Sequence, residues 1–221
     1  MNKEFVVAIL LLASTLVLRS SASDSEEDLF VKEYSVKDLL PKNGDGTELQ
    51  ELVQSTIDSW SWSAFGGDGT LLFQRHKMSV RQTSKIHTKL GALLQSLGKC
   101  PMRGSGNDPT EKQMRIGTKS SQDQGLMDIV VYPVEDILRA KLTSPASLLE
   151  TIRGQAGSPN DWDVTGGENF LAFFAHRPAI VATSFPNIHR QIVRIIQRHR
   201  KAARLKRSPD EIFKGREREH H

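Results

Sequence analysis

The chain has 221 residues, of which 38% are hydrophobic and 25% are charged, and its formal net charge is +4. This length suits one or two domains, and the single cysteine, Cys100, excludes an internal disulfide framework and a cysteine-based structural zinc site. The positive charge is concentrated at the end, because residues 188–221 hold eleven Lys and Arg against four Asp and Glu. The high isoelectric point is therefore a property of this last segment.

The first residues have the pattern of a secretory signal peptide. Residues 5–18 form a nearly unbroken apolar run that follows Lys3 and precedes a Ser-Ser-Ala stretch suited to signal peptidase. The run is shorter than the roughly 20 residues that cross a bilayer as a permanent helix, although an uncleaved anchor stays open as the alternative. The sequence therefore predicts a signal peptide at residues 1–22 and an exported mature protein, either periplasmic or extracellular.

Most of the chain consists of two copies of one unit. The segment WSAFGGDGTLLFQRH, which starts at Trp62, returns without a gap as WDVTGGENFLAFFAH, which starts at Trp162. Upstream, YSVKDLL at residues 34–40 is echoed by YPVEDIL at residues 132–138. Self-similarity of this kind indicates tandem structural units. Each unit is small, so we expect the two to stabilise each other or to be stabilised by a partner.

The first unit has the local signals of a small α+β module. Apolar and β-favouring residues predict strands, turn formers separate them, and apolar residues at helical spacing predict two helices with one buried face each. The order is strand, helix, strand, strand, helix, with these elements predicted at residues 29–36, from a cap at Thr47, at 70–73, at 78–81 and from a cap at Thr83 or Ser84.

The second unit repeats this order after a segment rich in Gly, Ser and Gln. Its elements are predicted at residues 127–132, from Ser144-Pro145, at 170–174, at 179–183, and in a closing helix with Pro186 in its first turn. The predicted fold class is α+β, with two tandem βαββα sandwich modules that each place two helices on one face of a three-stranded sheet. The predicted boundaries are 23–100 for the first module, 101–126 for a linker, 127–200 for the second module and 201–221 for a basic, partly disordered tail.

These motifs, in this order, resemble a known family. The sequence Tyr-x-Val-x-Asp-Leu-Leu, a helix, Ser-Trp-x-x-x-Gly-Gly, a hairpin and then RQTSKIH at residues 81–87 resembles a module of exported planctomycete-type proteins. That module is similar to the amino-terminal periplasmic domains of secretins. The resemblance implies a KH-like fold in each unit and units that stack in rings and bind partner proteins. After the second module the sequence lacks the run of alternating strands that forms a secretin gate, so we do not expect a complete secretin.

Histidines recur at matched positions of the two units, which raises the question of a metal. His76 matches His176, and His87 matches His189, with Asp68 or Glu168 as a conceivable third ligand. A metal site needs three or four convergent ligands, so the favoured interpretation is structural. A histidine in the first turn of a helix can cap it or pack beside a tryptophan, and one in a hairpin turn is solvated. We therefore predict no metal and no cofactor.

The sequence gives little support for an enzyme. Residues 66–69, GGDG, match the GxxG string of nucleic-acid-binding KH domains, but they precede a strand and include Asp68 where a phosphate-binding loop would carry basic residues. A tight turn explains these glycines better. No nucleophile-elbow, zinc-protease or P-loop string is present. We therefore predict a protein without catalytic residues.

Two sets of residues are candidates for interaction. The first is the pair Trp62 and Trp162, although a place in the core or between the modules is the favoured interpretation for both. The second is a basic extension of the last helix, whose charges are predicted to point in several directions and to lie outside any core; the alternative is a solvated helix end. Its candidate residues are Arg198, Arg200, Lys201, Arg204, Lys206 and Arg207.

Two functions follow from these observations. The first is a non-enzymatic exported protein whose modules mediate protein–protein interaction or assembly in the cell envelope, with an envelope or secretion-system protein, or a second copy of this chain, as partner. The alternative is a binder of an anionic polymer, meaning nucleic acid, acidic polysaccharide or a lipid surface, through the basic C-terminal helix. No small-molecule substrate is expected.

Overall fold

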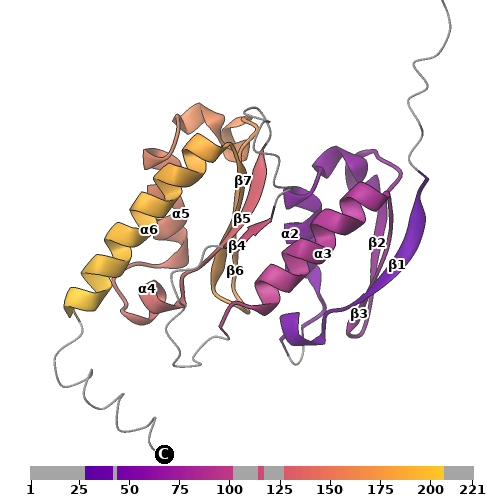
Figure 1. Cartoon of the computed structure of the whole chain (residues 1–221), viewed down its shortest axis with the longest axis horizontal. Helices are drawn as coiled ribbons and strands as arrows, with labels where there is room; N and C mark the ends of the chain where they lie inside the picture. Colours follow the sequence, from indigo (N-terminus) through magenta and orange to yellow (C-terminus); the bar gives the residue numbers. More distant parts are fainter. Residues whose placement is uncertain (1–27, 42–43, 102–113, 117–126, 207–221) are drawn as a thin grey trace, which may run out of the picture.

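The computed structural model describes residues 28–41, 44–101, 114–116 and 127–206, which form two α+β modules lying side by side (Figure 1). The predicted signal peptide lies outside the described residues. None of the described helices is long and apolar enough to cross a membrane.

The first module has the predicted order of strand, helix, strand, strand, helix. Its antiparallel sheet has the strand order β1-β3-β2, and both helices cover one face of it. Short 3-10 turns, η1 (Lys37–Leu39), η2 (Ser59–Ser61) and η3 (Ser63–Phe65), connect the main elements. Those elements are β1 (Phe30–Ser35), α2 (Thr47–Thr56), β2 (Thr70–Gln74), β3 (Lys77–Gln82) and α3 (Ser84–Gly98).

Local chemistry explains where these helices begin. The hydroxyl of Thr83 accepts from the Ile86 amide at 3.5 Å, as predicted for the cap of α3. The start of α2 differs by one residue from the prediction, because Gly46 is the N-cap and Thr47 is the first helical residue. Gly46 has φ +86°, a conformation that Thr47 could adopt only with strain.

The second module repeats the order and adds two elements that were not predicted. One is the short helix α4, and the other is β4 (Met114–Ile116), which lies within the predicted linker and pairs antiparallel with β5. The sheet therefore has four strands in the order β4-β5-β7-β6, where three were predicted. The remaining elements are β5 (Asp128–Pro133), α4 (Glu135–Arg139), α5 (Pro145–Gln155), η4 (Pro159–Asp161), η5 (Asp163–Thr165), β6 (Phe170–Phe174), β7 (Ala179–Ser184) and α6 (Pro186–Lys206).

The recurring glycine pair is required by a tight turn in both modules. Gly66 has φ +95° and Gly166 has φ +88°, so a side chain at either position would be strained. A Cβ on Gly67 would lie 2.4 Å from the Ser61 carbonyl carbon, and one on Gly167 would meet Asp161 in the same way at 2.1 Å. The interpretation of GGDG as a turn is therefore confirmed.

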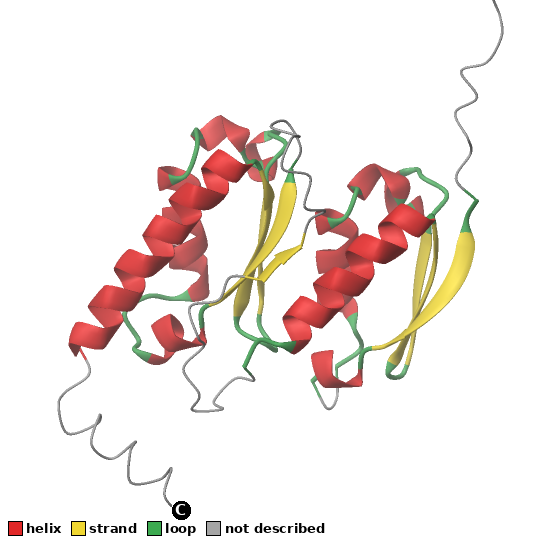
Figure 2. Ribbon diagram, in the orientation of Figure 1, coloured by secondary structure: helices red, strands yellow, loops and turns green. Residues whose placement is uncertain are grey.

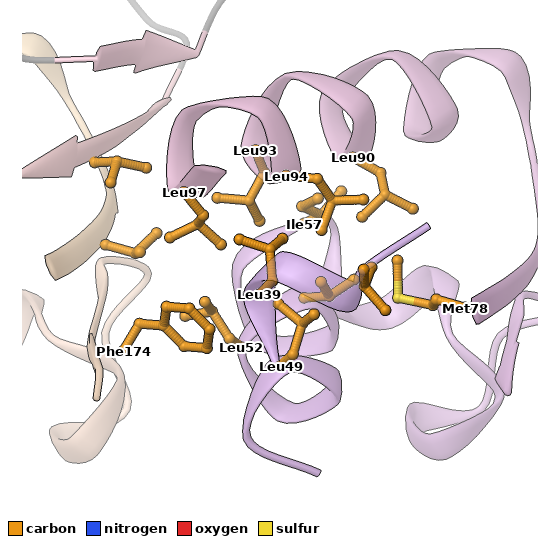
Figure 3. Packing of buried hydrophobic residues seen from close by; sticks show 14 of the residues in the cluster. Leu39, Leu49, Leu52, Ile57, Met78, Leu90, Leu93, Leu94, Leu97 and Phe174 are labelled. Atoms are coloured by element: carbon orange, nitrogen blue, oxygen red, sulfur yellow. The ribbon is translucent and has the colours of Figure 1, made fainter. Parts of the chain in front are cut away.

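The hydrophobic core of the first module continues onto one face of the second sheet, whose other face packs on α5 and α6 in a separate core. Helix α2 contacts β6 and β7, and α3 contacts β4 and β5, so the helices of the first module lie between the two sheets (Figure 2). Residues of the second sheet, including Val131, Phe174 and Val181, belong to the same buried cluster as Leu52 and Leu97 (Figure 3). The expectation that the modules stabilise each other is thus confirmed.

The outer face of the first sheet and the matching face of the second sheet differ in composition, because only the second is covered by another module. On the second sheet, Val131 and Val181 face the helices of the first module and are fully buried. Their counterparts in the repeat are Glu33, which is exposed, and Ser79, which is half-buried on the outer face of the first sheet. The outer face of the first sheet, which also carries Val31 and Leu72, is in contact with solvent.

Arg177, in the turn between β6 and β7, fastens this turn to the first module. Its guanidinium donates to the carbonyl oxygens of Asp38 at 3.0 and 3.1 Å, Gly98 at 3.0 Å and Cys100 at 2.6 Å. The Gly98 and Cys100 carbonyls lie at the end of α3, where the last carbonyls of a helix have no partner within the helix. A cation is stabilising at this position. Arg177 is only 8% exposed, so these bonds form away from water.

Cys100 lies beside this contact, so the reactivity of its thiol can show whether the contact is closed. Its thiol is buried, and burial raises the pKa of Cys100 to about 12, an effect that the Arg177 charge partly offsets. Because the thiolate is the reactive form, the thiol is inert while the modules are docked.

Changing Val181 to Lys should destabilise the whole protein by about 3–5 kcal/mol, because the charge would be buried between the modules without a partner. Urea denaturation measures this loss. The matched control is Ser79→Lys, which faces solvent opposite Glu33 and should change stability by less than about 0.5 kcal/mol. Equal effects of the two variants would contradict the shared core.

Changing Arg177 to Met should accelerate labelling of Cys100 by a thiol reagent by about tenfold or more at pH 8, since three carbonyls would lose their donor. The charge effect has the opposite sign, because removing Arg177 raises the pKa of Cys100 further. Faster labelling can therefore come only from opening of the contact. The control is Arg75→Met in the exposed hairpin turn of the first module. Cys100 of this variant should be labelled at the same rate as in the unchanged protein.

Candidate interaction surfaces

Both recurring tryptophans are core residues. The side chains of Trp62 and Trp162 are fully buried, in agreement with the core placement that the sequence favoured. The indole of Trp62 donates to the Ile57 carbonyl at 2.7 Å, and that of Trp162 donates to the matched Ala156 carbonyl at 3.1 Å. Each ring thus joins the end of the first helix to the turn that follows, and neither is available to a partner.

The recurring helix histidines form a repeated structural lock with tyrosines. His87 Nε2 lies 3.1 Å from the Phe30 carbonyl oxygen, so this nitrogen carries the proton, and Nδ1 accepts from the Tyr34 hydroxyl at 2.9 Å. His189 is held in the same way by Asp128 and Tyr132, at 2.9 and 2.8 Å. The predicted packing beside a tryptophan is wrong, because the tyrosine of the first strand lies on the same face of the sheet as the start of the closing helix.

The hairpin histidines do not meet the proposed third ligands. Asp68 precedes β2 and His76 follows it, so a five-residue strand of about 3.3 Å per residue separates them. Glu168 and His176 flank β6 in the same arrangement. Within the described part of the chain, no three His, Cys, Asp or Glu side chains gather as they would around a metal ion.

Three aromatic side chains are exposed at one end of the first module. Trp60 is 78% exposed, Phe65 is 47% exposed and Phe30 is 44% exposed. Gln82 links two of the segments that carry them, because it pairs with Phe30 across the sheet and donates to the Ser61 carbonyl in η2 at 3.0 Å. The Phe30 ring lies against that of His87, with ring centroids 4.4 Å apart. We call Trp60, Phe65 and Phe30 the aromatic end.

The aromatic end belongs to the first module alone. At the matched positions the second module has Asn160, Thr165 and Asp128, which are polar. The sequence analysis missed these residues because it looked for what recurs. The signal was present in the opposite form, as large aromatic residues at positions where the other copy is polar.

Exposed cations line one face of α6. They recur at intervals of three and four residues, which places them on one side of a helix, and they extend over about 21 Å along its axis. The helix has no acidic residue. We call this set the cation row: Arg190, Arg194, Arg198, Lys201 and Arg204. Three of the predicted basic residues, Arg198, Lys201 and Arg204, thus share one face, Arg200 points in another direction, and Arg190 was missed.

The remaining basic candidates have other places. Arg200 is mostly buried, forms an ion pair with Asp136 at 2.9 Å and donates to the Pro133 carbonyl at 2.6 Å. Ala203, one turn further, is also buried. The prediction that the extension lies wholly outside the fold is therefore wrong, and α6 continues past the predicted module boundary at residue 200. Nothing is described of the Lys206 side chain, and Arg207 lies outside the described residues.

The charge of the cation row comes from arginine and lysine without a contribution from histidine. Burial, and then the neighbouring Arg198 charge, lower the pKa of His199, so its ring is neutral at neutral pH. Arg198 donates to the Gln155 side chain of α5 at 2.8 Å, a neutral partner that leaves its charge uncompensated.

Comparison with known proteins adds little to this picture. No protein-family model matches the chain, and no curated protein matches it. Among solved structures, the chain is similar to Aeromonas hydrophila ExeD, with 9% sequence identity and a TM-score of 0.23. The similarity covers 79% of this chain and 28% of the ExeD chain, so this chain spans less than a third of the ExeD length. A TM-score of this size carries no argument about fold or function.

Changing Tyr34 to Phe should lower the free energy of unfolding by about 1–3 kcal/mol, because His87 is buried and its Nδ1 would lose the donor. Burial raises the pKa of the Tyr34 hydroxyl, so this group donates throughout the neutral range. Urea denaturation measures the loss. The double variant Tyr34→Phe with His87→Leu should lose less than the sum of the two single variants; additive losses would contradict the lock.

Proposed function

We propose that this chain is a non-enzymatic exported protein that binds a partner protein in the cell envelope through the aromatic end of its first module. The observation that carries the proposal is Trp60, whose side chain is 78% exposed. Large exposed aromatic groups are costly to leave in water, and tryptophan is enriched among the residues that dominate protein interfaces. Phe65 and Phe30 add further exposed apolar area in this module.

The architecture supports this role because the two modules pack against each other through apolar contacts and the Arg177 hydrogen bonds. The shared core and the Arg177 contacts hold the second module against the helices of the first. The aromatic end stays exposed beside this contact, on the turns η2 and η3 and the start of β1. A partner would therefore meet a preorganised surface, which reduces the entropy lost on binding.

The sequence supplies the remaining support. The resemblance of the motifs to secretin amino-terminal modules, which bind partner proteins, favours an interaction role by analogy. The apolar run near the N-terminus favours export, with the cell envelope as the place of action. The recurring histidines favour a non-enzymatic reading, because both ring nitrogens of His87 and His189 are engaged within the fold.

The test is capture of the partner by the immobilised protein from an envelope extract. The double variant Trp60→Ser with Phe65→Ser should lose at least about tenfold in retained partner, as expected when interface anchors are truncated, while its melting temperature stays unchanged. The matched control is Asn160→Ser with Thr165→Ser, at the same positions of the second module. Equal capture by the unchanged protein and the aromatic variant would refute the proposal.

A second candidate function is binding of an anionic polymer through the C-terminal helix. The specific observation in its favour is the cation row of α6, whose like charges at intervals of three and four residues cost helix stability. A row of this kind attracts polyanions from solution, and the attraction weakens as salt is added.

A further inference from the structure

The layer formed by α5 and α6 in the second module corresponds to the layer of α2 and α3 in the first, which packs on the second sheet. In the first module, the α2 and α3 layer is covered by the second sheet, and the contact includes Leu52 and the Thr56 carbonyl, which accepts from Thr183 at 3.0 Å. Ser96 of α3 is buried and Ala92 is half-buried in this layer. These residues are small or apolar, as burial under a sheet requires.

The same positions of the second module carry hydrogen-bonding and charged groups. By the register of the repeat, Leu52 becomes Thr151, Thr56 becomes Gln155, and Ala92 and Ser96 become Arg194 and Arg198. Gln155, Arg194 and Arg198 are exposed, and Thr151 is half-buried. A third sheet cannot dock on this layer, because its apolar residues would have to bury unpaired guanidinium groups.

The arrangement places neutral polar groups beside the cations. Arg198 donates to Gln155 at 2.8 Å, which fixes the outer side of α5 next to the cation row. Thr151 lies one turn before Gln155 on the same face of α5. A ligand that lies along α6 would therefore meet both guanidinium groups and amide or hydroxyl groups.

The chemistry of this face separates the classes of anionic ligand. A lipid surface favours helices that insert a stripe of apolar residues, but Ile188, Ile192 and Ile195 of α6 are buried in the core. Leu205 is 79% exposed, and a single leucine does not form such a stripe. Single-stranded nucleic acid is held by stacking on aromatic rings, and α5 and α6 contain no Phe, Tyr or Trp. An acidic polysaccharide needs cations for its carboxylate or sulfate groups and neutral polar groups for its hydroxyls, and both are present.

We propose that the outer face of α5 and α6 binds a linear acidic polysaccharide. Arg190, Arg194, Arg198 and Lys201 pair with successive anionic groups of the polymer, and Thr151 and Gln155 bond to sugar hydroxyls beside them. This inference rests on the second candidate function and is independent of the partner protein at the aromatic end.

The first experiment measures the affinity of the full chain for a polyuronate at low salt. The triple variant Arg190→Gln, Arg194→Gln and Arg198→Gln should bind at least about tenfold more weakly, from the loss of three exposed charge pairs. The control is Lys85→Gln and Lys89→Gln on the matched helix α3 with Lys99→Gln at its C-cap. This variant removes the same charge and should bind within about twofold of the unchanged protein. Unchanged binding by the α6 variant would overturn the proposal.

The second experiment separates a polysaccharide from other polyanions. The variant Thr151→Val with Gln155→Leu keeps every charge, and it should weaken polyuronate binding about threefold or more while inorganic polyphosphate binding stays the same. Equal affinity of this variant for polyuronate, or tighter binding of the unchanged protein to polyphosphate or to anionic lipid vesicles than to polyuronate, would overturn the assignment of the ligand. The aromatic variant Trp60→Ser with Phe65→Ser should bind polyuronate normally, so failure here and failure of the partner-protein proposal are distinguishable.

Discussion

Burial of the back of the second sheet is the constraint on which the rest of the structure depends. Val131, Phe174 and Val181 present an apolar face that α5 and α6 do not cover, and removal of such area from water contributes about 25 cal/mol per Å². Only the helices of the first module provide a matching surface. The contact places α2 and α3 between two sheets, buries Cys100 and brings Arg177 to the end of α3. A small module that would be marginal alone thereby becomes part of one larger core.

A contact between the sheet of one module and the helices of another is head-to-tail, and such contacts propagate unless both ends of the stack are blocked. Both ends of this molecule differ from the buried contact. At one end, the outer face of the first sheet carries Glu33 and Lys77 where the second sheet has Val131 and Ala179, together with the exposed Val31 and Leu72. At the other end, Arg194 and Arg198 replace small residues of α3. Polar outer surfaces on the terminal repeats end the stack of a repeat protein in the same way.

The internal repeat also separates structural residues from candidates for binding. Residues that recur, such as Trp62 with Trp162 and His87 with His189, are buried and satisfied within each module. Exposed groups of unusual chemistry occur where the copies differ, as aromatic rings at the end of the first module and as cations along α6. Duplicated units keep what the fold requires, so differences at exposed positions are the better guide to function.

The order of elements, the caps at Thr83 and Ser144 and the apolar stripe of α3 could be predicted from the sequence, because each depends on residues within a few positions of one another. The repeat also predicted the turn at Gly66-Gly67. The docking of the modules, the pairing of β4 and the separation of Arg198 from Arg200 were decided by the tertiary structure. These features depend on contacts between distant segments, as when Arg200 meets Asp136 of α4 while Arg198 turns toward solvent. Composition makes both residues basic, and only their direction around a packed helix assigns one to the fold and the other to the surface.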